Sequence, residues 1–129
     1  MTENLFTKGM AKLMEVDGRS GEAVIERLRG IAPDMGRYIV EFAFGEIMSR
    51  PGLDLKSREI ATVAALTAMG GCEPQLAVHI NGLLNVGGTR EEVVEIMIQM
   101  AVYAGFPAAL NALFTAEKVF AERDAAQHP

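Results

Sequence analysis

The sequence contains a single cysteine, Cys72, and no long apolar segment. One cysteine cannot form a disulfide within the chain, so a cytoplasmic location is expected. No apolar run reaches the roughly eighteen residues that a membrane span requires, because a charged residue or a glycine interrupts each one. The first residues include Glu3 and lack a long apolar core followed by a small-residue cleavage site. We therefore expect neither a signal peptide nor a membrane segment.

Positive charge is also scarce. The chain has 12 Lys and Arg residues against 17 Asp and Glu residues, and the two signs are interspersed. Because no basic stripe is present, nucleic acid is not an expected partner. Half of the residues are hydrophobic, which is high for a small soluble monomer. More apolar surface is expected than one chain can bury, so the composition predicts a homo-oligomer.

Recognisable metal and nucleotide motifs are missing as well. The sequence has no His-Glu-x-x-His motif and no cluster of carboxylates and histidines with ligand spacing, so no metal site is expected. The Gly-Gly pairs lie where helices should end, whereas a dinucleotide fingerprint joins a strand to a helix. The sequence therefore offers no recognisable metal or dinucleotide site.

The pattern that is present is helical. Apolar residues recur at spacings of three and four, and no alternating run is bounded by hairpin turns. A length of 129 residues fits one domain, 1–129. We predict an all-α bundle of about seven helices in which the pair within 55–87 forms a central antiparallel hairpin. The expected helices are 3–15, about 21–30, 33–49, 55–69, 74–87, 90–104 and a last one that follows Gly105-Phe106-Pro107 and ends near 123.

Several residues mark where these helices should begin. Ser20 can cap the second helix, and Pro33 fits the first turn of the third, where its missing N–H costs nothing. Thr89 and Glu92 have the spacing of a capping box. The helix that starts at Pro33 is apolar nearly all round, so it should be covered on several sides.

His79 is the first candidate for chemistry, since it is the only histidine outside the extreme C-terminus. It shares a helix face with Leu76 and Leu83, so its ring points where leucines point. One interpretation is a core or interface histidine bonded to a backbone carbonyl. The other is a proton donor or acceptor, which suits an imidazole because its pKa lies near neutrality.

Two carboxylates and two arginines lie nearby in the sequence. Glu59 occupies a mostly apolar helix face, and Arg58, the residue before it, lies on the adjacent face. This position predicts either a structural salt bridge or a functional carboxylate. Glu46 and Arg50 are four residues apart in the order that favours a helical ion pair. Such pairs are common on surfaces, but Glu46 lies on an apolar side of its helix.

Cys72 directly precedes a predicted helix. The exposed amide groups of a helix N-terminus lower the pKa of a thiol, so Cys72 is a possible redox residue or nucleophile. The alternative is an inert cysteine, which is the commoner case.

Two long stretches resemble the carboxymuconolactone decarboxylase family, within the larger alkylhydroperoxidase D-like group. They read FAFGEIMSRPGLDLKSREIATVAALTAMG and EPQLAVHINGLLNVGGTREEVVEIMIQMAVYAGFPAALNAL. The resemblance covers about residues 20–120 and depends on the pieces GEI-x-x-RPGLD, EPQL-x-x-H, NVG-x-TREE and YAGFPAALNA in that order. It implies an all-helical subunit whose hairpins interlock into dimers, trimers or hexamers.

The resemblance also implies an activity. In its best-known branch this is cofactor-free decarboxylation of γ-carboxymuconolactone (4-carboxymuconolactone) to 3-oxoadipate enol-lactone in protocatechuate breakdown. A related small carboxylated lactone is the other expected substrate. For that chemistry Arg50 and Arg58 are expected to hold carboxylates, and His79 to donate the proton or stabilise the oxyanion. Glu46 or Glu59 would orient His79.

Two alternatives remain at this point. The peroxidase branch of the group carries Glu…Cys-x-x-Cys-x-x-x-His, and counting back from His79 places Cys72 at the first cysteine and Gln75 at the second. Because the second thiol is missing, that alternative requires Cys72 to act with an external thiol. The third interpretation is a non-catalytic helical oligomer that serves as a binding or scaffold module.

Overall fold

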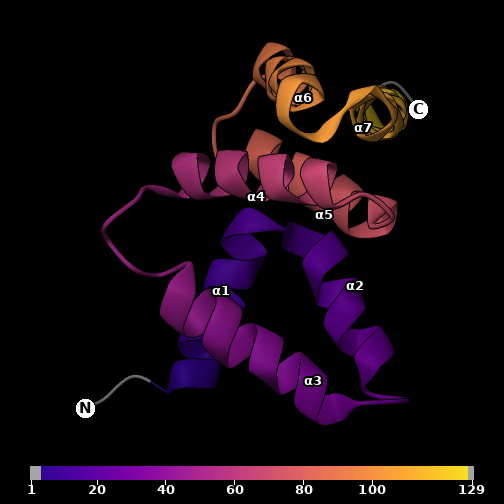
Figure 1. Ribbon diagram of the computed structural model, residues 1–129. Coiled ribbons are helices and arrows are strands. Elements are labelled where there is room, and N and C mark those ends of the chain that lie inside the picture. Colours follow the sequence, from indigo (N-terminus) through magenta and orange to yellow (C-terminus); the bar gives the residue numbers. More distant parts are fainter. Residues whose placement is uncertain (1–3, 128–129) are drawn as a thin grey trace. The chain divides into compact units, whose positions relative to one another are not determined.

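The computed structural model describes residues 4–127, which form seven α-helices and one π-helix (Figure 1). The all-α prediction is confirmed, since this described part contains no strand. None of its helices combines the length and the apolar character needed to cross a membrane. The chain divides into two compact units, residues 1–55 and residues 56–129.

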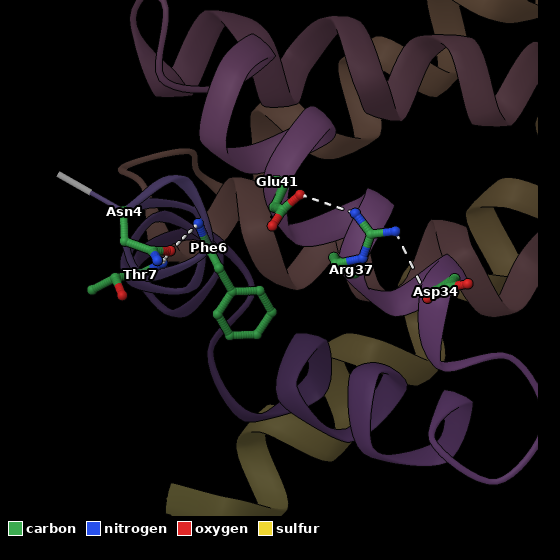
Figure 2. A network of polar contacts seen from close by, with 6 residues as sticks. All are labelled: Asn4, Phe6, Thr7, Asp34, Arg37 and Glu41. Carbon is green, nitrogen blue, oxygen red and sulfur yellow. Dashed lines mark hydrogen bonds and ion pairs between the residues drawn. The ribbon is translucent and has the colours of Figure 1, made fainter. Parts of the chain in front are cut away.

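The first unit begins with a capped helix. Asn4 Oδ1 accepts hydrogen bonds from the backbone amides of Phe6, at 2.8 Å, and Thr7, at 3.2 Å (Figure 2). These bonds satisfy two amides that have no partner within the helix. The helices of this unit are α1 (Leu5–Val16), α2 (Gly18–Leu28), α3 (Pro33–Tyr38) and the π-helix η1 (Ile39–Ile47).

The second helix starts earlier than predicted. Ser20 lies inside α2 and not at its cap, because Gly18 adopts a φ of +61° and turns the chain directly from α1 into α2. Glycine adopts this left-handed conformation at little cost, so no separate capping residue or loop is needed.

The helix predicted for 33–49 is present but changes its geometry. Pro33 lies in the first turn of α3, as predicted. From Ile39 onward the backbone is a π-helix, and the amide of Met48 bonds to the carbonyl of Ala43 five residues earlier, at 2.8 Å. The apolar pattern did not indicate this change, since it records which side chains are apolar and not which carbonyl each amide reaches. Extended π-helices are rare.

Close contact between α1 and η1 holds the first unit together. A side chain at Gly9 would overlap the backbone carbonyl of Val40, and a Cβ at Gly45 would lie 2.9 Å from Leu5 Cδ1. The two glycines therefore let the helices approach closely. The expectation that this helix is covered on several sides is not met within the chain, because Phe42 remains 60% exposed.

Arg37 connects the polar side of α3 to η1 (Figure 2). Its guanidinium lies 3.4 Å from Glu41 Oε2 and 3.7 Å from Asp34 Oδ1, and it stacks over the Tyr38 ring at 4.8 Å. These side chains are all at least partly exposed to solvent, so each ion pair contributes at most about 1 kcal/mol.

The second unit contains the predicted hairpin. Its helices are α4 (Leu55–Met69), α5 (Glu73–Asn85), α6 (Arg90–Ala104) and α7 (Phe106–Gln127). Gly70 and Gly71 both have positive φ and turn α4 into α5. Bonds between Leu66 and Cys72, and between Glu59 and His79, show that the two helices run antiparallel.

The second unit has a capped helix, α6, and a core of aliphatic side chains. The predicted capping box is confirmed, because Thr89 and Glu92 exchange both of its hydrogen bonds, at 3.0 and 2.9 Å. Fully buried residues come from all four helices, and those of the core cluster are Val63, Leu76, Ile80, Leu83, Val93, Met97, Ala112, Ala116 and Val119.

Two exposed ion pairs join neighbouring helices of the second unit. Lys56 lies 3.0 Å from Glu92, and Arg90 lies 2.7 Å from Asp124. The hydrogen bond from Lys56 holds the pKa of Glu92 below its ordinary value, and the hydrogen bond from Arg90 does the same for the pKa of Asp124. Because both pKa values are lowered in the folded chain, this stabilisation is present at neutral pH. It is lost as the pH falls through the folded values.

The last helix is longer than predicted. It was expected to end near residue 123, but α7 continues to Gln127. His128 and Pro129 lie outside the described residues.

The contact at Gly9 yields a stability prediction. Gly9→Ala should lower the free energy of unfolding by about 1–3 kcal/mol, because the new methyl group overlaps the Val40 carbonyl and forces the helices apart. Urea denaturation followed by circular dichroism measures this change. Gly52→Ala is the matched control, since a Cβ there meets no atom within 4 Å. Equal stability of the two variants would contradict the close-contact argument.

Candidate functional site

A buried carboxylate and a half-buried imidazole meet inside the α4–α5 hairpin. Glu59 on α4 is 0% exposed, and its Oε1 lies 2.9 Å from Nδ1 of His79 on α5. The His79 side chain is 24% exposed. The hairpin thus connects a fully buried carboxyl group to a ring that still reaches the surface.

This contact bears on the hydrogen of the ring. An ionised carboxylate can only accept hydrogen bonds, so toward an ionised Glu59 it is Nδ1 of His79 that carries the hydrogen. The other oxygen of Glu59, Oε2, is buried and has no hydrogen-bond partner among residues 4–127. Of the two carboxylates considered for orienting His79, Glu59 forms the hydrogen bond.

The two arginines lie in different settings. Arg58 neighbours Glu59 on α4 and is half-buried, and its backbone carbonyl accepts a bond from Thr62 Oγ1 at 2.9 Å. Arg50 belongs to the first unit and is exposed, beyond the end of η1. Arg58 is therefore the arginine that shares a helix with Glu59.

The Glu46 side chain is exposed on η1 and forms no hydrogen bond or ion pair within the described part of the chain. The pair with Arg50 that the spacing favoured does not form, because η1 ends at Ile47 and Arg50 follows in a turn. A spacing of four residues brings side chains together only while the chain remains α-helical.

Cys72 takes part in a structural contact. Its Sγ donates a hydrogen bond to the backbone carbonyl of Leu66, at 3.2 Å, near the end of α4. A cavity of about 10 Å³ lies beside it, and the buried hydroxyl of Thr67 also lines this cavity. The thiol therefore bonds to the backbone near the end of α4, and the redox role of Cys72 stays a prediction.

The sequence analysis missed a polar connection between α5 and α7. Arg123 Nη1 donates to Asn81 Oδ1 at 2.6 Å, and Nη2 lies 3.4 Å from Asn85 Oδ1. The spacing of four between Asn81 and Asn85 was the available signal, because it places both amides on one helix face.

The second unit also has a larger hollow, of about 440 Å³, between α5 and α7. Its walls include Ala77, Phe114 and Lys118, and the six residues proposed for chemistry are not among those that line it. The candidate site is therefore defined by the Glu59–His79 contact and not by the size of a cavity.

Comparison with known proteins identifies the family. The model of the carboxymuconolactone decarboxylase family matches residues 33–118. The chain belongs to the carboxymuconolactone decarboxylase family. This confirms the resemblance seen in the sequence, over a range somewhat shorter than the predicted 20–120. The helical architecture is correspondingly that of the alkylhydroperoxidase D-like group.

Three curated relatives are similar over most of the chain. A 4-carboxymuconolactone decarboxylase of Acinetobacter baylyi is 35% identical, covering 92% of this chain and 88% of the relative. An uncharacterized protein of Paracoccus denitrificans is 37% identical, covering 73% and 71%. A nitrosuccinic acid decarboxylase of Metarhizium robertsii is 32% identical, covering 88% and 80%. Two of these three relatives are thus named as decarboxylases.

The role of Cys72 can be tested by stability. Cys72→Ala should lower the free energy of unfolding by about 0.5–1.5 kcal/mol, because the Leu66 carbonyl loses its donor. Cys72→Ser should lose less, since a hydroxyl can donate in place of the thiol. Urea denaturation measures both values. If the serine variant were the less stable of the two, the hydrogen bond would not be the reason for the cysteine.

Proposed function

We propose that this protein is a carboxy-lyase that decarboxylates γ-carboxymuconolactone, or a related small carboxylated lactone, without a cofactor. The product would be 3-oxoadipate enol-lactone, within protocatechuate breakdown. Family membership and the names of two relatives support a decarboxylase. The observation that carries the site assignment is the 2.9 Å contact between Glu59 and His79.

The reaction requires a proton donor and stabilisation of negative charge. When the carboxylate leaves as CO2, the electron pair of the broken C–C bond delocalises through the ring double bond into the lactone carbonyl. The resulting extended enolate is then protonated on a ring carbon, which completes the reaction without an oxidant or reductant. His79 is the proposed proton donor or the stabiliser of the enolate oxygen.

Glu59 is the proposed positioning residue for His79. By accepting the Nδ1 hydrogen it holds the ring orientation, and its negative charge would stabilise an imidazolium. The buried position of Glu59 excludes water from the bond, which strengthens the interaction relative to an exposed pair. Glu46 is left as a secondary candidate, since its side chain is exposed.

Arg58 and Arg50 are proposed to bind the carboxylates of the substrate. Guanidinium groups suit this role because their planar fork matches a carboxylate. Arg58 is the stronger candidate, since it directly precedes Glu59 on α4. We also propose that 1–129 form one family domain, that the protein is cytoplasmic, and that it assembles as a homo-oligomer, a trimer or hexamer by the family resemblance.

An ultraviolet assay with γ-carboxymuconolactone tests the proposed function. His79→Ala should lower kcat by roughly 10²–10⁴-fold, the usual contribution of a general acid. Glu59→Gln should lower kcat by roughly 10–150-fold, because the negative charge of the acceptor is lost while an acceptor oxygen and the side-chain volume are kept. The pH profile should change in Glu59→Gln, which a purely structural role would not produce.

Nitrosuccinic acid belongs in the same assay, because a relative is named for it. Its carbanion would delocalise into the nitro group just as that of the lactone delocalises into a carbonyl. If His79→Ala turned over an accepted substrate at an unchanged rate, the site assignment would be disproved. If the wild type turned over neither acid, the proposed substrates would be wrong and only the family membership would remain.

Arg58 gives an independent prediction. Arg58→Ala should raise KM for the accepted acid more than it lowers kcat, because a carboxylate anchor acts on ground state and transition state alike. Arg58→Lys should recover part of the loss, since the positive charge remains while the fork is lost. Steady-state kinetics measure both constants. If KM were unchanged in Arg58→Ala, residues other than Arg58 would bind the substrate carboxylate.

A further inference from the structure

The small cavity beside Cys72 lies where three helices of the second unit meet. Its volume is about 10 Å³. Thr67 near the end of α4, Cys72 and Glu73 at the start of α5, and Asn111 on α7 are among the residues that line it. One water molecule needs roughly 10–15 Å³ of such space. The cavity therefore has the size of a single water and is too small for a larger ligand.

Thr67 brings a buried hydroxyl group to this cavity. The residue is 2% exposed, and its Oγ1 has no hydrogen-bond partner among residues 4–127. A hydroxyl that is removed from water without a new partner destabilises the folded chain. Buried polar groups in proteins are accordingly bonded to other protein groups or to ordered water.

Two other threonines show which partner Thr67 does not use. The hydroxyl groups of Thr62 on α4 and Thr115 on α7 each donate to the backbone carbonyl four residues earlier, at 2.9 Å. This bond is the usual one for a threonine inside a helix. Thr67 also lies inside a helix but does not form it. Its hydroxyl is therefore available to a partner in the cavity.

The cavity lining supplies further polar groups. Cys72 Sγ donates its hydrogen to the Leu66 carbonyl, so the sulfur can serve only as a weak acceptor. Asn111 carries an amide that both donates and accepts, and Glu73 carries a carboxylate. The Cys72 side chain does not cap α5, and the first amides of a helix have no partner within it. A buried water binds two to four polar groups, and these groups suffice.

We propose that this cavity is a binding site for one water molecule, anchored by the hydroxyl of Thr67. The water links the end of α4 to the start of α5 and to α7. It thereby stabilises the closed end of the hairpin that carries Glu59 and His79. The site does not depend on the proposed decarboxylation, and its test requires no substrate.

A high-resolution crystal structure tests the site directly. In the wild type an ordered water should lie about 2.5–3.0 Å from Thr67 Oγ1, the range of a hydrogen bond between two such oxygens. Thr67→Ser should retain this water, because the hydroxyl remains, and Thr67→Val should lose it. Thr62→Val is the matched control, since the hydroxyl of Thr62 is bonded within α4, and the water should remain there. A wild-type cavity without this water would overturn the proposal.

Urea denaturation gives a second test, in which the direction of the change decides. If a water satisfies the hydroxyl, Thr67→Val removes favourable hydrogen bonds and should lower the urea midpoint. If the hydroxyl has no partner, the same change removes a buried unpaired group and should raise the midpoint. Valine has the branched shape of threonine and a similar helix propensity, so packing and helix formation change little. An unchanged or higher midpoint in Thr67→Val would overturn the proposal.

Discussion

The buried carboxylate of Glu59 is the constraint on which the second unit depends. A buried charge is costly unless it is paired, and the hydrogen bond to His79 supplies the partner. That pairing requires α4 and α5 to run antiparallel in one register, which the Gly70-Gly71 turn makes possible. A single hairpin thus sets both the fold of this unit and the orientation of its candidate catalytic group.

The glycines of the chain perform two different physical tasks. At Gly70 the backbone adopts a conformation that other residues reach only with strain, which turns one helix into the next. Gly9 has no such requirement on φ, and its contribution is the absence of a side chain where α1 meets η1. The first unit is therefore held partly by close backbone packing, and some of its apolar side chains, such as Phe42, remain exposed.

The small size of the buried residues also explains why large apolar side chains of α7 are exposed. The alanines of α7 bury one narrow face and leave the larger Phe106 and Phe114 outside. Small residues permit close helix packing but remove little apolar area from water. A chain built in this way has more apolar surface than its own core can cover, and assembly is the ordinary means by which such surface is removed from water.

The sequence alone determined the helical class, the family, the α4–α5 hairpin and the capping box at Thr89, because periodicity, glycine pairs and capping residues act over a few neighbouring positions. His79 was likewise identified by its residue type. The tertiary structure decided which carboxylate reaches His79, since Glu46 and Glu59 had equally suitable chemistry. It also decided the π-helical geometry of η1 and the structural contact of Cys72. These features depend on which distant backbone and side-chain atoms come within bonding distance, which local patterns do not record.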